Sequence, residues 1–62
     1  MNRREFERHL RSEGCVLQHH GAKHDVWMNP TTPACVPVPR HRTLKRGTCR
    51  GICRILGIPF PK

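Results

Sequence analysis

Turn-forming residues divide this chain into five short segments, and this division constrains the fold more than any other feature of the sequence. Glycine, proline and asparagine are the strongest local breaks in helices and strands. Here they fall at Gly14, at Gly21-Ala22-Lys23, at Asn29-Pro30-Thr31-Thr32-Pro33, in the loop that begins at Pro39, and at Gly57 with Pro59. The chain has 62 residues, which is enough for one small domain over residues 1–62 with a marginal hydrophobic core.

The outer two segments are predicted to be helices and the inner three to be strands. Asn2 followed by Glu5 resembles a capping box and predicts a helix near residues 3–13. Strands are predicted over residues 15–20, 24–29 and 34–38, and a second helix over residues 47–56. Pro37 indicates that the third strand lies at an edge. The fold class is therefore α+β, in the order α-β-β-β-α, with a three-stranded antiparallel sheet, both helices on one face and the other face open.

The charge of the chain indicates a polyanionic partner. Twelve Lys and Arg residues oppose four Asp and Glu residues, for a net charge of +8, and no acidic residue follows Asp25. Nucleic acid is favoured over an anionic membrane surface or an acidic protein as the partner. The N-terminal residues lack an apolar export segment and no stretch reaches transmembrane length, so we expect a cytosolic protein without a membrane role.

The four cysteines, Cys15, Cys35, Cys49 and Cys53, allow two interpretations. A zinc site usually shows two close ligand pairs, and Cys15 and Cys35 have no close cysteine partner. Each cysteine instead falls where the pattern requires an apolar residue, and free cysteine behaves as a small hydrophobe. We therefore expect reduced core cysteines and no metal or cofactor. A zinc-binding regulator remains the alternative, which metal analysis tests.

Aromatic and histidine side chains outside the expected site are assigned structural roles. Trp27 is expected to pack the sheet with its indole N–H hydrogen-bonded at the margin, rather than to stack on a base. His9, His19 and His20 are expected to be exposed and are assigned no role. Arg50 and Arg54, one turn apart on the second helix, either follow phosphates or solvate that face.

The order and spacing of several short segments resemble the HicA family of bacterial toxins, small mRNA interferases with a double-stranded-RNA-binding-like α-β-β-β-α fold. The resemblance covers nearly everything from Asn2 to Phe60. The segments are Glu13-Gly14-Cys15, Gly21-Ala22-Lys23-His24, Trp27-Met28-Asn29-Pro30, Val36-Pro37-Val38-Pro39, Arg40-His41 and Lys45-Arg46-Gly47-Thr48-Cys49-Arg50-Gly51-Ile52.

The resemblance implies a catalytic histidine at the end of a Gly-Ser-His-like hairpin motif, and the matching residue is His24. Lys23 stands where serine is common in the family. The implied activity is endonucleolytic cleavage of mRNA, and the implied partner is a HicB antitoxin that covers the active site.

From the residues themselves we expect a metal-independent reaction in which neutral His24 is the general base. Cationic side chains would bind RNA and stabilise the charge of the phosphorane. These are Lys23, Arg40, His41, Arg42, Lys45 and Arg46. His41 is expected first as an RNA contact and second as the acid. The alternative is a non-catalytic RNA-binding module of the same fold.

Overall fold

A computed structural model of the protein describes residues 1–61, and it has the predicted order of elements. The elements are α1 (Arg3–Ser12), β1 (Val16–His20), β2 (His24–Asn29), β3 (Ala34–Pro39) and α2 (Arg46–Leu56). The predicted fold class is confirmed. β2 has the predicted bounds, and each other element differs by one residue at one end.

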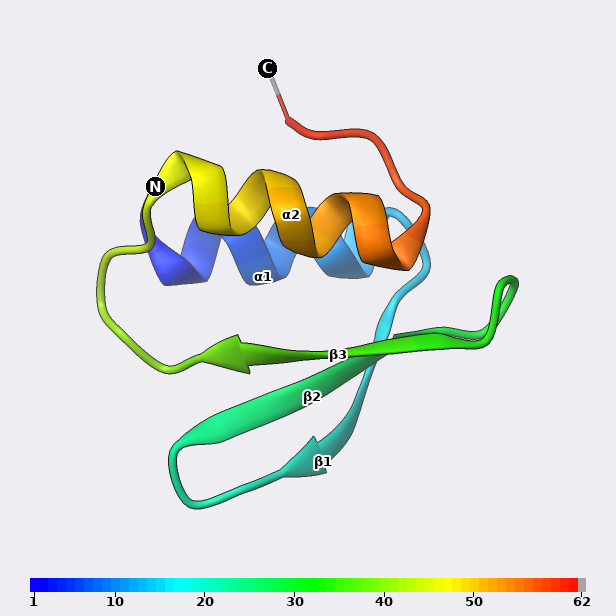
Figure 1. Ribbon diagram of the computed structural model, residues 1–62, viewed down its shortest axis with the longest axis horizontal. Helices are drawn as coiled ribbons and strands as arrows, with labels where there is room; N and C mark the ends of the chain where they lie inside the picture. The colour runs from blue at the N-terminus through cyan, green and yellow to red at the C-terminus, as the bar shows by residue number, and fades with distance from the viewer. Residues whose placement is uncertain (62) are drawn as a thin grey trace.

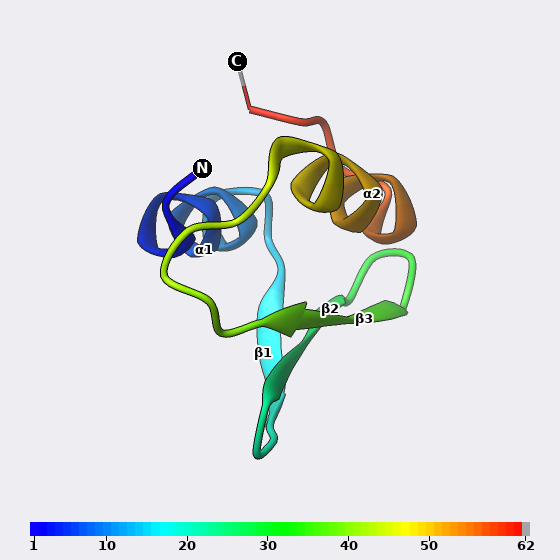
Figure 2. The same cartoon turned by 60° about the vertical axis from the view of Figure 1, so that its left-hand side comes forward.

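The three strands form an antiparallel sheet in the order β1-β2-β3. Both helices lie side by side on one face of this sheet, and the opposite face is uncovered by any helix (Figures 1 and 2). β3 lies at an edge, as Pro37 predicted, because proline has no amide hydrogen and is tolerated in a sheet where that position faces solvent rather than a second neighbouring strand. The ladder between β1 and β2 shifts register between Leu17 and His19. We call the uncovered side the open face.

The ends of both helices are set by local sequence. Asn2 is the N-cap of α1, where its side-chain oxygen accepts a hydrogen bond from the Arg4 amide at 2.8 Å. Gly14 follows this helix with a φ of 87°, and Gly57 ends α2 with a φ of 71°. Left-handed backbone of this kind favours glycine, so both glycines terminate a helix. Neither helix has the length and apolar character to cross a membrane, within residues 1–61.

The core lies between the helices and the near face of the sheet. It is built from alternate residues of β2 and β3 together with one face of each helix, and its members are Phe6, Leu10, Cys15, Trp27, Val36, Val38, Leu44, Cys49, Ile52, Cys53 and Leu56. Burial of these side chains supplies the main favourable term for folding. The predicted core role is thus confirmed for Cys15, Cys49 and Cys53.

The same prediction is wrong for Cys35, which is exposed. Successive strand residues point to opposite faces, so Val36 faces the helices while Cys35 pairs with Met28 on the open face. All four cysteines are free thiols.

Trp27 packs in the core as predicted, with 1% of its surface exposed. The expected hydrogen bond of its indole N–H is wrong, because Nε1 has no partner among residues 1–61. The ring lies fully inside the layer between sheet and helices, rather than at its margin. The Arg11 guanidinium covers it at 5.1 Å from the ring centroid.

The first three residues of the chain hold the basic loop between β3 and α2 against the first helix. Asn2 forms an isolated antiparallel bridge with Thr43. The Arg3 amide donates to the Arg42 carbonyl at 3.0 Å, and the Leu44 amide donates to the Met1 carbonyl at 2.6 Å. These bonds and the buried Leu44 side chain fix the position of the basic loop relative to α1.

Candidate active site on the hairpin between β1 and β2

His24 is the first residue of β2 and lies exposed at the open face. Along β2, Asp25, Trp27 and Asn29 are buried towards the helices, so the alternation directs His24 to the opposite side. Its side chain makes no hydrogen bond or ion pair within residues 1–61. The imidazole is therefore free to receive a proton from a bound molecule.

Gly21 holds the backbone of His24 by close approach. The Gly21 amide donates to the His24 carbonyl at 2.9 Å. A Cβ at position 21 would lie 2.7 Å from that same carbonyl oxygen, closer than real Cβ contacts allow. Glycine is required here for space and not for an unusual φ, since its φ is not positive. The close approach of the two backbone segments thus explains why the predicted turn begins with glycine.

A buried carboxylate follows His24 directly. The Asp25 side chain is 9% exposed and is approached by two basic groups, His20 Nδ1 at 2.8 Å from Oδ1 and Arg40 NH1 at 3.6 Å. Oδ1 makes no well-directed hydrogen bond with any residue in 1–61, so both are close contacts rather than aligned bonds. Asp25 is the sole acidic residue after Glu13 in the sequence.

Arg40 connects the hairpin to the end of β3. Its NH1 lies 2.7 Å from His20 Nε2, its NH2 donates to the Ala22 carbonyl, and its own carbonyl accepts a bond from Arg3 NH1 at 2.9 Å. The guanidinium thus contacts the hairpin both before and after His24. Sequence reasoning placed Arg40 among RNA contacts and gave His20 and Asp25 no role, and it missed this cluster.

The other predicted RNA-binding residues lie at differing distances from the hairpin. Lys23 is exposed beside His24. Pro39 is the register partner of His24, and it also lines a shallow pocket of about 260 Å³ with His41 and Lys45. Pro39 therefore lies between the position of His24 and the His41–Lys45 loop, and we call Lys23, His24, His41 and Lys45 the basic strip. Arg42 instead lines a separate pocket of about 340 Å³ beside the start of α1.

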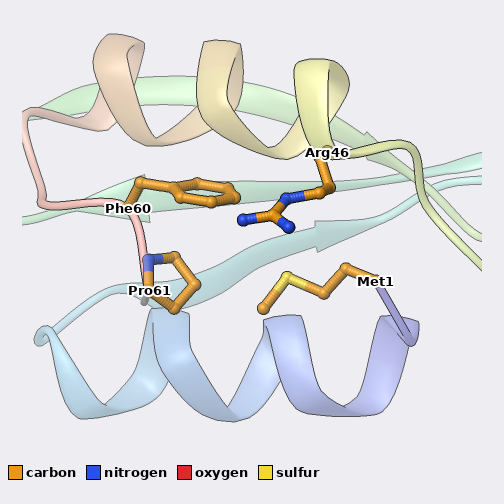
Figure 3. A pocket seen from close by; sticks show the side chains of 4 residues that line it. All are labelled: Met1, Arg46, Phe60 and Pro61. Carbon is orange, nitrogen blue, oxygen red and sulfur yellow. The ribbon is translucent and has the colours of Figure 1, made fainter.

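Arg46 lies on the helix layer, away from the open face. It lines a pocket of about 270 Å³ with Met1, Phe60 and Pro61, between the two helices (Figure 3). Its guanidinium lies 5.7 Å from the Phe60 ring centroid, and that of Arg50 lies 5.1 Å from the same centroid. Stacking of this kind is a cation–π contact. The structure therefore separates Arg46 from the strip around His24.

The three buried thiols offer no competing centre. Burial raises the pKa of the Cys15 and Cys49 thiols, and it raises the pKa of Cys53 to about 11. Protonated thiols are poor nucleophiles and poor metal ligands. Among residues 1–61, no group of three or more His, Cys, Asp or Glu side chains is arranged to hold a metal ion. His24 is thus the candidate reacting group.

The fold and this site define a small basic α-β-β-β-α protein that presents an exposed histidine, His24, beside the turn of a hairpin. Comparison with models of protein families matches residues 3–58 to the HicA toxin of bacterial toxin–antitoxin systems, and the chain belongs to this family. The matched region spans nearly all of the structure. No curated protein and no solved structure matches the chain.

Proposed function

We propose that the protein is the toxin of a type II toxin–antitoxin system and acts as a metal-independent endoribonuclease on mRNA, with His24 as its catalytic base. The observation that carries this proposal is an exposed, unpaired imidazole at the start of β2, in a chain of the HicA family. Histidine suits the role because its unperturbed pKa lies closest to neutral pH.

RNA supplies its own nucleophile, which limits what the protein must provide. His24 takes the proton of a 2′-hydroxyl, the 2′-oxygen forms a bond to the adjacent phosphorus, and the bond from phosphorus to the 5′-oxygen breaks. The 5′-oxygen receives a proton from a second acid, either protonated His41 or water. The products are a 2′,3′-cyclic phosphate and a 5′-hydroxyl end.

Cations along the strip next to His24 provide the remaining contribution. Lys23 is adjacent to the base, and His41 and Lys45 line the pocket that begins at Pro39. Fixed positive charge aimed at the phosphorane stabilises the transition state more than the ground state. Arg42 and Arg46 extend the positive surface onto α1 and α2 and contact more distant phosphates.

The antitoxin, of HicB type, covers the hairpin and the open face. Three observations support this placement: the face is covered by no helix, Val16 on it is 45% exposed, and Lys23 and His24 stand at its end. Burial of this apolar surface favours association, and acidic residues of the antitoxin would meet the basic strip. Hydrogen exchange of the complex tests the placement, since protection absent from β1 and the hairpin contradicts it.

Cleavage of a long single-stranded RNA in EDTA tests the activity. Wild-type protein is compared with His24→Ala and with His9→Gln, a histidine change on α1. We expect cleavage by wild type and by His9→Gln, loss of at least a hundredfold in His24→Ala, and cyclic phosphate ends. Products that carry only 5′-phosphates overturn the mechanism. Binding by wild type and His24→Ala alike, with cleavage by neither, identifies a non-catalytic RNA-binding module.

A further inference from the structure

We propose that Asp25, Arg40 and His20 form a positioning cluster that holds the hairpin in the conformation that presents His24 to RNA. The role in catalysis rests on the proposed ribonuclease function. The cluster itself is inferred from contacts among the three side chains. It assigns Arg40 to the support of the catalytic residue rather than to the substrate. It also assigns Asp25 and His20 a positioning role.

The Arg40 guanidinium contacts the chain on both sides of His24. Arg40 contacts the Ala22 carbonyl, two residues before His24, and lies 3.6 Å from the carboxylate of Asp25, one residue after it. The Gly21 amide also donates a hydrogen bond to the His24 carbonyl, across the same turn. Movement of the His24 backbone would therefore disturb contacts on either side.

His20 completes the cluster from β1. It is the register partner of Asp25, and its ring contacts both the Asp25 carboxylate, at 2.8 Å from Nδ1, and Arg40 NH1, at 2.7 Å from Nε2. The three side chains come from the three strands or their ends. A single cluster thus joins β1, β2 and the end of β3 at the point where the hairpin turns.

Burial explains why the charge at Asp25 is costly to leave without its partners. A buried carboxylate needs a cation or a hydrogen-bond donor beside it, and removal of Arg40 leaves its charge uncompensated. The arrangement also hides Arg40: its side chain is only 23% exposed, compared with the exposed side chains of Lys23, Arg42 and Lys45. NH1 and NH2 of Arg40 already contact His20 and Ala22 within the protein, which leaves fewer of its donors for a phosphate.

The two roles for Arg40 predict opposite results for Asp25→Asn. If the cluster positions His24, Asp25→Asn and Arg40→Ala both lower kcat, by about tenfold to a hundredfold, because small displacements of a reacting group have effects of this size. KM then changes little, and the double variant is no worse than the poorer single variant. If Arg40 binds phosphate, Arg40→Ala raises KM, and Asp25→Asn lowers KM because a negative charge is gone.

Rescue by a conservative variant separates positioning from charge. Lysine keeps the positive charge but lacks the planar fork that reaches Ala22, Asp25 and His20 together. We expect Arg40→Lys to stay within about threefold of Arg40→Ala in kcat, and recovery to the wild-type rate overturns the proposal. Arg8→Ala, an exposed arginine change on α1, serves as the matched control and should retain wild-type kcat.

Hydrogen exchange of the Gly21 amide gives a readout that needs no cleavage. In Arg40→Ala and His20→Ala, we expect faster exchange at Gly21 while amides of α1 and α2 stay protected, and unchanged exchange at Gly21 overturns the proposal. Thermal unfolding shows that each variant is folded at the assay temperature. If Asp25→Asn does not fold, the Arg40 and His20 variants carry the test. If wild type cleaves no RNA, the proposed function fails while the exchange result still decides the cluster.

Discussion

The Gly21 amide and the His24 carbonyl are joined by a hydrogen bond of 2.9 Å across a turn that leaves no room for a side chain at position 21. The backbone conformation of His24, the candidate catalytic residue, therefore depends on Gly21, which has no side chain and cannot react. It also explains why a glycine begins the hairpin motif.

Replacement of Gly21 by alanine should therefore impair activity without contacting RNA. The added Cβ would lie 2.7 Å from the His24 carbonyl oxygen, so the backbone at His24 must move. We expect kcat on RNA to fall by about tenfold or more, with KM nearly unchanged. Gly47→Ala is the matched control, because a Cβ there meets no atom within 4 Å. Equal losses in both variants would argue against a local effect at His24.

RNA binding should depend on salt through a small number of phosphate contacts. Each contact to single-stranded RNA contributes about −0.7 to the slope of log K against log salt concentration. Lys45→Ala and Lys23→Ala should each make the slope less negative by about this amount. Fluorescence anisotropy with a labelled RNA and the His24→Ala background measures it. A slope that does not change in either variant would remove the strip around His24 as the binding surface.

Asn29 joins the second turn to the end of α2 and should be important for stability. Its Nδ2 donates to the Leu56 carbonyl at 2.8 Å, and its Oδ1 accepts from the Thr31 amide at 3.0 Å. The residue is 5% exposed. Asn29→Ala leaves buried polar groups unpaired, so the free energy of unfolding should fall by about 2 to 3 kcal/mol. Asn29→Asp keeps only the acceptor and should also lose stability in urea unfolding, whereas wild-type stability in both variants would contradict these bonds.

Thiol reactivity should distinguish the one exposed cysteine from the three buried ones. Cys35 is exposed, while Cys15, Cys49 and Cys53 lie in the core. At pH 8, a disulfide reagent should modify one thiol quickly and the other three only after denaturant is added. In Cys35→Ser the fast reaction should vanish. Rapid modification of a second thiol in the native protein would contradict the packing of α2.

Stability should decrease at alkaline pH because of the buried thiols. The pKa of Cys53 is raised from 9.0 to about 11 by burial first, and then by the nearby Cys49, Cys15 and Glu13. Below pH 9 the thiol is protonated in both states and pH has no effect through this group. Between pH 9 and 11 the unfolded chain releases the proton and the folded protein keeps it, so unfolding becomes more favourable. The loss from Cys53 reaches about 3 kcal/mol, and urea unfolding of Cys53→Ala should show a smaller loss.

The elements of this fold could be predicted because the signals for them are local. Gly14, Gly57 and the two turns mark the ends of segments, and residues within each segment fix its type. Leu56 could be assigned to the core from helical periodicity, and Trp27 could be assigned to it because a large aromatic side chain favours burial. Strict alternation along β3 would also have placed Cys35 outside, since Val36 and Val38 on either side of Pro37 are buried.

The candidate site could be predicted only in part, because its support is not local. Lys23 and His24 are neighbours in a recognisable turn, but it was the resemblance to the HicA family, and not their spacing, that singled out His24 as the candidate catalytic residue. The contacts of Arg40 with His20 and Asp25 depend on the register of two strand pairs and on the irregular pairing between Leu17 and His19. No pattern within one segment indicates that a basic-loop arginine faces inwards. Phe60 likewise reaches Arg46 and Arg50 only through the path of the C-terminal segment.

The prolines of β3 make the two edges of the sheet unequal in their ability to pair with a further strand. Pro37 and Pro39 have no amide hydrogen, so a foreign strand alongside β3 would find acceptors without the matching donors. Strand-to-strand aggregation is disfavoured at that edge for as long as the fold persists. The other edge, β1, keeps its amides and is exposed along its whole length. Self-association of the chain through strand pairing would therefore use β1. A protein partner that pairs with β1 would prevent this self-association and would also cover the hairpin.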